Sequence, residues 1–146
     1  METLDTDLYR DPFPHMIVKN FYNESELKLI WEELDFYTKD GKLFDAHEFG
    51  GVVDKTNSKA IWLDKIFSKK YRNLSNILKV NRKMFDSAVL GAFSSIHDCC
   101  HIAQFCNYDV TKVRYYHDDD YYEPHIDKTV QFLGFSYFFR EPKKFE

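Results

Sequence analysis

The segment Tyr122-Glu-Pro-His-Ile-Asp127 places a histidine and an aspartate two positions apart. In an extended strand, residues two apart point to the same side, so His125 and Asp127 present an imidazole and a carboxylate together. Two histidines and one carboxylate on one face of an octahedron leave three adjacent positions open, which suits iron(II) chemistry with an organic co-substrate and oxygen. We therefore predict that His125 and Asp127 are metal ligands.

The spacing of this pair is by itself weakly specific, because the chain contains 6 His and 24 Asp and Glu residues. The competing interpretation is a surface histidine beside a turn aspartate. The context favours the metal interpretation, since the pair lies between two aromatic stretches and follows Pro124, which stiffens the approach.

The elements around this pair are expected to be strands, because Thr, Val, Tyr and Phe dominate from Val110 onward. The predicted strands cover residues 111–116, 122–127 and 130–139. An earlier short strand is predicted over Met16–Phe21.

Helical spacing dominates the earlier part of the chain. Asn23 or Ser25 is predicted to cap a first helix, and Ser75 a second one that continues irregularly toward His101. The apolar residues of these helices are Leu27, Ile30, Trp31, Leu34, Ile77, Leu78, Phe85 and Val89. A loop is expected between Thr38 and Asn57, and Ala60–Phe67 has no clear assignment. This order predicts one α+β domain over residues 1–146, with a mainly helical support region at 1–106 and the first core strands at 107–146.

Composition excludes several classes of partner. Hydrophobic residues make up 44% of the chain and the net charge is -4, so the chain can bury a core but does not attract phosphate backbones or anionic lipid. No signal peptide or membrane span is recognisable, and an odd count of 3 Cys fits a reducing compartment. We expect a soluble, cytoplasmic protein that binds neither nucleic acid nor membrane.

The order of the motifs resembles the prolyl-4-hydroxylase-like branch of the iron(II)- and 2-oxoglutarate-dependent oxygenases, especially its small phage and marine bacterial members. The resemblance spans nearly the whole chain. The segments that carry it are Asp11-Pro-Phe-Pro-His15, Trp31-Glu-Glu-Leu34, Lys55-Thr-Asn57, Trp62-Leu-Asp64, Tyr115-Tyr116, Asp120-Tyr121-Tyr122, His125-Ile126-Asp127, Phe135–Phe139 and Glu141-Pro142-Lys143-Lys144-Phe145.

The resemblance implies a double-stranded β-helix, or cupin-like jelly roll, and a dioxygenase that hydroxylates a peptidyl proline or another peptide side chain. In such enzymes oxygen is split between 2-oxoglutarate and the second substrate, and ascorbate supports activity. His125 and Asp127 match the first two iron ligands. Tyr115 and Tyr122 match tyrosines of the 2-oxoglutarate pocket, although core packing is an equally good account of Tyr115 and the favoured one for Tyr122. A phage-encoded member would act in the cytoplasm of its host.

The resemblance also implies a Gly-Gly-Asp or Gly-Gly-Glu stretch, a second histidine ligand and a basic anchor for 2-oxoglutarate after Lys144, whereas the sequence ends at Glu146. We therefore expect an amino-terminal portion of the domain that is inactive alone. The other histidines do not lie at positions where the family has an iron ligand. They are His15, His47, His97, His101 and His117. The alternative is a non-catalytic binding or assembly protein of the same ancestry, which pairs with a second chain that completes the fold.

Two further metal interpretations are weaker. His97-Asp98-Cys99-Cys100-His101, with Cys106 nearby, collects ligands that zinc accepts, but adjacent cysteines are expected to point apart and to be small buried residues. Asp118-Asp119-Asp120 lacks the glycine and the distal glutamate of a calcium loop, so a solvated turn is expected there.

Overall fold

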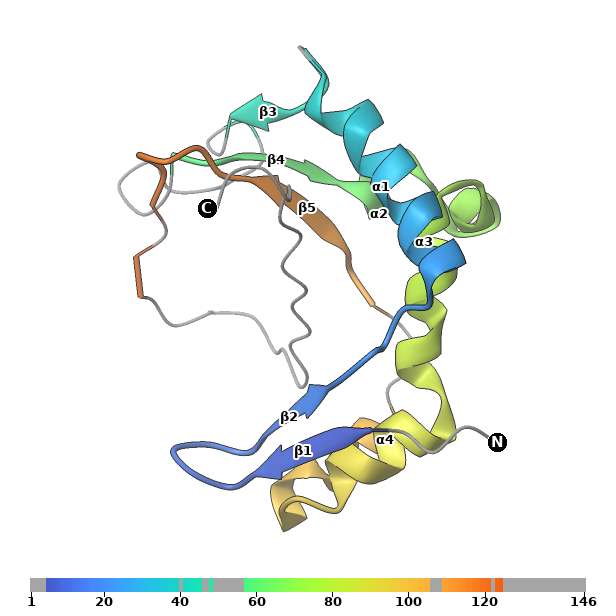
Figure 1. Cartoon of the computed structure of the whole chain (residues 1–146), viewed down its shortest axis with the longest axis vertical. Helices are drawn as coiled ribbons and strands as arrows, with labels where there is room; N and C mark the ends of the chain where they lie inside the picture. Colours follow the sequence, from blue (N-terminus) through green and yellow to red (C-terminus); the bar gives the residue numbers. More distant parts are fainter. Residues whose placement is uncertain are drawn as a thin grey trace.

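The structure is a computed structural model that describes residues 5–39, 41–45, 48, 57–105, 109–121 and 123–124. It is a mixed α+β structure with small antiparallel sheets (Figure 1). One sheet pairs β1 (Thr6–Tyr9) with β2 (His15–Val18), and the other has the order β3 (Phe44–Asp45), β4 (Lys59–Trp62) and β5 (Lys112–Tyr115). The predicted α+β mixture of helices and strands is therefore confirmed, and the strand pairs are antiparallel.

Helix α1 (Glu24–Thr38) begins with a capping box. The Asn23 side chain accepts a hydrogen bond of 2.9 Å from the backbone N–H of Glu26, and the Glu26 carboxylate accepts one of 2.9 Å from the backbone N–H of Asn23. These bonds satisfy amide groups that a helix start leaves without partners. The predicted cap at Asn23 is confirmed, and the helix buries Ile30, Leu34 and Tyr37.

The second helical region is broken into short pieces. They are α2 (Leu63–Ile66), η2 (Lys69–Leu74), α3 (Asn76–Val80), η3 (Asn81–Phe85), α4 (Ser87–Ser94) and η4 (Asp98–Phe105), where η denotes a 3-10 helix. Ser75 caps α3 by accepting a 3.1 Å hydrogen bond from the Leu78 amide, as predicted. The continuation toward His101 is interrupted at Asp86, whose extended backbone (φ -61°, ψ 138°) ends one helix before the next begins.

The central core lies between α1, α3 and the paired strands β4 and β5. The register opposes Ile61 to Val113, and both side chains are buried. Ile30 and Leu78 are only 1% exposed, and burying such a side chain stabilises the fold by about 1.5–3 kcal/mol. This packing fixes β5, the strand that leads toward the predicted metal ligands.

Several boundaries differ from the sequence prediction. The strand predicted over residues 16–21 is observed at His15–Val18, and the one predicted over 111–116 at Lys112–Tyr115. The unassigned stretch 60–67 supplies most of β4 and all of α2. The strand predicted over 130–139 lies outside the described residues, as does most of the one predicted over 122–127. Region 1–106, expected to be mainly helical, also carries β1 to β4.

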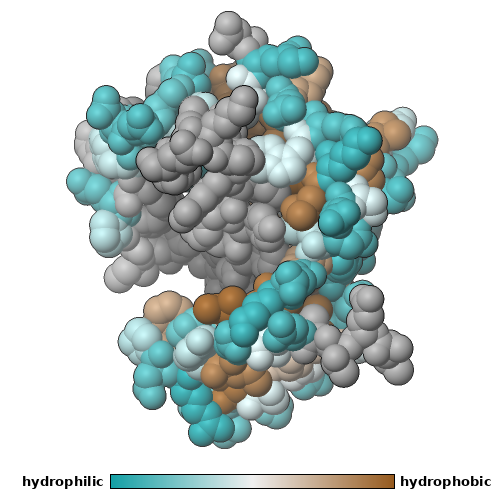
Figure 2. Space-filling model, viewed as in Figure 1, coloured by the Kyte–Doolittle hydropathy of each residue, from teal (hydrophilic) through white to brown (hydrophobic). Residues whose placement is uncertain are grey.

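The β1–β2 hairpin is tied to the segment after α4, since Arg10 Nε donates a 2.9 Å hydrogen bond to the carbonyl oxygen of Ile96. Hydrophilic and apolar residues are interspersed over the visible face (Figure 2). Within the described part of the chain, no helix combines the length and the apolar character needed to cross a membrane.

Candidate functional site

Tyr115 is the predicted site residue that the structure places, whereas Tyr122, His125 and Asp127 lie outside the described residues. It is the last residue of β5, and it lies opposite Lys59 of β4. Because residues two apart share a strand face, Tyr115 lies on the face of the buried Val113, at the edge of the core. Its ring makes an edge contact with His117 at 4.9 Å, and its hydroxyl group has no hydrogen-bond partner among the described residues.

The acidic stretch after β5 forms a tight turn. The Asp120 amide donates a 3.0 Å hydrogen bond to the His117 carbonyl, and the His117 amide donates one of 2.7 Å to Oδ2 of Asp120. Asp118 and Asp119 are exposed. The expected solvated turn is confirmed.

Asn57 anchors this turn from a position more than fifty residues earlier. Its Oδ1 accepts a 2.8 Å hydrogen bond from the Tyr121 amide, and its Nδ2 lies 3.4 Å from the carbonyl oxygen of Asp119. An asparagine side chain offers both a donor and an acceptor, so one residue can contact both backbone groups. Asn57 thereby sets the direction in which the chain leaves toward Pro124. Asn57 belongs to the Lys55-Thr-Asn57 segment of the resemblance, but its contact with the turn was not predicted, because the bonded residues are 62 and 64 positions apart.

A second histidine-x-aspartate spacing exists at His117 and Asp119 and was also missed. These residues lie in the turn, where the alternation of a strand does not apply, and His117 Nδ1 lies 3.3 Å from Oδ2 of Asp120 instead. Within the ranges that the structure describes, no group of three histidine, cysteine or acidic side chains could hold a metal ion. Spacing alone therefore does not separate a metal pair from a turn.

The beginning of β5 is held by charged side chains. The guanidinium group of Arg72 donates to the carboxylate of Asp64 and, at 2.9 Å, to Oδ1 of Asp109. The other carboxylate oxygens accept from Thr111, at 2.5 Å from its amide to Asp64 and at 2.7 Å from its hydroxyl to Asp109. The three charged side chains are only 12–13% exposed. This cluster joins α2 and η2 to the start of β5.

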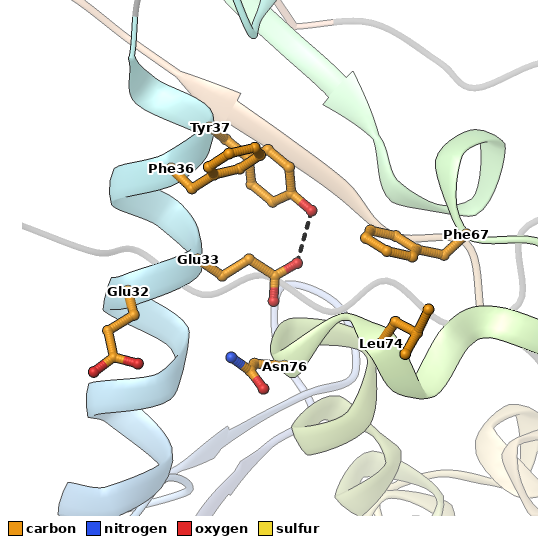
Figure 3. Close-up of a pocket in the computed structure, with 7 residues that line it drawn as sticks. All are labelled: Glu32, Glu33, Phe36, Tyr37, Phe67, Leu74 and Asn76. Carbon is orange, nitrogen blue, oxygen red and sulfur yellow. Dashed lines mark hydrogen bonds between the residues drawn. The ribbon is translucent and has the colours of Figure 1, made fainter.

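An open depression of about 280 Å³ lies between α1 and the η2–α3 segment (Figure 3). Its central carboxylate, Glu33, accepts hydrogen bonds from the Tyr37 hydroxyl at 2.7 Å, the Ser75 hydroxyl at 2.6 Å and the Ile77 amide at 2.8 Å. Burial, followed by the hydrogen bond to Glu33, raises the pKa of Tyr37 above its ordinary value of 10.0. Glu33 thus joins α1 to the start of α3, and the depression contains none of the predicted site residues.

The cysteine and histidine cluster differs from the expectation. Cys99 is exposed and Cys100 is buried, yet their sulfur atoms lie only 3.9 Å apart, so the prediction that they point apart was wrong. The Cβ atoms of neighbours diverge, but rotation about each Cα–Cβ bond can bring both sulfur atoms to one side. Cys106 lies outside the described residues.

Comparison of the chain with protein-family models, with curated proteins and with solved structures finds no match.

Proposed function

We propose that this chain belongs to an iron(II)- and 2-oxoglutarate-dependent dioxygenase of the prolyl-4-hydroxylase-like type, built on a jelly roll and acting on peptide or protein side chains in the cytoplasm. The observation that carries the proposal is the order of Tyr115, Tyr122, His125 and Asp127 in a single stretch of chain. The structure supports it at the one residue of this set that it describes.

That support is the position of Tyr115. It ends a strand that pairs with β4, whose Ala60 and Ile61 are buried, and its hydroxyl group makes no hydrogen bond to a described residue. A tyrosine at the rim of the core whose hydroxyl group bonds to no described residue fits a residue that donates to a carboxylate of 2-oxoglutarate.

In this proposal His125 and Asp127 hold iron(II), and Tyr115 and Tyr122 line the co-substrate pocket. Iron with 2-oxoglutarate supplies oxygen activation when bound, and ascorbate keeps the metal reduced. The protein residues fix the metal position, orient the co-substrate and present the second substrate. Asn57 orients the turn from which the metal-binding segment departs.

The test is an anaerobic titration of the 146-residue chain with iron(II), with and without 2-oxoglutarate. It is followed by the visible charge-transfer band of the chelate and by paramagnetic broadening of backbone NMR signals. The resemblance places a third ligand and a carboxylate anchor after Lys144, so binding to the 146-residue chain should be weak. At high concentrations of iron(II) and 2-oxoglutarate we expect broadening centred on residues 121–127, a band that requires 2-oxoglutarate, and the loss of both in His125→Ala.

The matched control is His117→Ala, because His117 begins the competing histidine-x-aspartate spacing on the same segment. This variant should retain the band and the broadening. If His117→Ala removes them while His125→Ala does not, or if no metal is bound near residue 125, the proposed site is wrong.

A further inference from the structure

The start of η4 brings an imidazole and two thiols together. His97 Nδ1 lies 3.2 Å from the sulfur of Cys99, and the backbone amide of Cys99 donates a 3.2 Å hydrogen bond to the same nitrogen. Because an amide N–H can only donate, Nδ1 is the acceptor of this hydrogen bond. The Cys99 thiol lies at the same distance from this nitrogen as the amide, so Nδ1 can also accept the proton of that thiol.

The two thiols differ in environment. Cys99 is exposed to solvent, whereas Cys100 is 4% exposed, and its amide donates a 2.8 Å hydrogen bond to the carbonyl of His97. Burial, together with the neighbouring Cys99 sulfur, raises the pKa of the Cys100 thiol. One sulfur is thus accessible beside a base, and the other is shielded from solvent at a distance of 3.9 Å from it.

We propose that Cys99 is a peroxide-reactive thiol and that Cys100 is its resolving thiol. His97 removes the proton of Cys99, and the thiolate attacks one oxygen of a hydroperoxide. The O–O bond breaks, Cys99 becomes a sulfenic acid, and the departing alkoxide or hydroxide takes a proton to leave as an alcohol or water.

The second step closes a bond between neighbouring residues. The Cys100 sulfur attacks the sulfenic sulfur, and the hydroxyl group leaves with the thiol proton as water. The peroxide has then taken up two electrons in total, and the pair is a disulfide. Sulfur atoms that begin 3.9 Å apart need only a small movement to react.

The product should be easy to reduce. Adjacent Cα atoms are about 3.8 Å apart, below the separation of about 4.4–6.8 Å that unstrained disulfides span. Strained, accessible disulfides are the labile ones, so an ordinary dithiol should reverse the modification.

The test uses the 146-residue chain with Cys106→Ser, so that only the pair remains. The reduced protein is treated with hydrogen peroxide, free thiols are alkylated, and the fragments are mapped by mass spectrometry. We expect a mass loss of two hydrogen atoms at Cys99–Cys100, reversed by dithiothreitol. If the chain also carries Cys100→Ser, the sulfenic acid on Cys99 should persist and react with added dimedone to give an adduct. If it carries Cys99→Ser instead, Cys100 should remain unoxidised.

The role of His97 is tested by rate. His97→Asn should slow Cys99 oxidation by about tenfold, because the base beside the thiol is lost. His101→Asn, which alters an exposed histidine within η4, should not change the rate. The urea-unfolded chain supplies the reference. The proposal is overturned if folded Cys99 reacts no faster than unfolded Cys99, or if Cys100→Ser yields no adduct.

Discussion

The two ends of β5 are held in contrasting ways. At its beginning, Arg72 bridges Asp64 and Asp109 in a cluster that is only 12–13% exposed. At its end, the exposed Asn57 contacts two backbone groups of the following turn. Buried, charge-assisted contacts contribute far more than exposed neutral ones. The strand is therefore firmly fixed where it enters the core, and the turn leading to the proposed iron ligands can open at little cost.

The largest effect should follow from Arg72→Met. The methionine keeps much of the apolar stem but leaves Asp64 and Asp109 without their shared cation. Removing one partner of a buried ion pair costs about 3–5 kcal/mol, and we expect urea denaturation to show a loss of that size. Lys19→Met, which breaks the exposed 2.9 Å pair with Asp7, is the control and should unfold like the unmodified chain. If Arg72→Met and Lys19→Met lost equal unfolding free energy, burial would not explain why the Arg72 cluster holds β5 more firmly than exposed contacts do.

An intermediate effect is expected from Tyr37→Phe, which removes a buried hydrogen bond to a carboxylate without involving a cation. Hydrogen bonds to charged groups contribute about 1.5–3 kcal/mol, so urea denaturation at pH 7 should show a loss of about that size.

The same substitution has a defined pH dependence. Folding raises the pKa of Tyr37 above 10.0, so its contribution is fully present below pH 10 and is lost as the pH rises toward the folded value. The difference in unfolding free energy between the unmodified chain and Tyr37→Phe should therefore shrink above pH 10. Tyr71→Phe, at a residue that is 50% exposed, is the control and should have no effect at either pH. A difference that stays constant with pH would contradict this assignment.

The smallest effect on global stability, but the clearest local one, should come from Asn57→Ala. We expect the unfolding free energy to fall by less than about 1 kcal/mol, since the lost contacts are exposed. Amide hydrogen exchange at Tyr121 should accelerate about three- to fivefold as the turn opens. Asn57→Asp keeps the acceptor for the Tyr121 amide, so it should retain most of the protection. Unchanged exchange in Asn57→Ala would show that another contact holds the turn.

Local signals in the sequence were sufficient for several elements. Asn23 and Ser75 cap their helices as expected, because a cap is a bond between residues three apart. The strand around Val113 was likewise predicted from its residue types. The 3-10 helices η2, η3 and η4 were not, because helical spacing does not reveal where backbone angles break the helix.

The contacts that position the candidate site were much less predictable. Neither the Arg72 cluster nor the Asn57 anchor leaves a local pattern, since each joins residues dozens of positions apart. The paired sulfur atoms of Cys99 and Cys100 depend on side-chain rotation, which the expectation from backbone geometry did not include.

The sequence by itself determined the caps, the apolar faces and the order of Tyr115, Tyr122, His125 and Asp127, because these depend on residue type and short separations. Only the tertiary structure decided that Glu33 caps a helix from another element, that Asn57 holds the turn after β5, and that His97 faces an accessible thiol. The contacts of Glu33 and Asn57 arise when packing brings distant segments together, and the free energy that selects them belongs to the whole core. The contact of His97 joins residues two positions apart and depends on side-chain rotation.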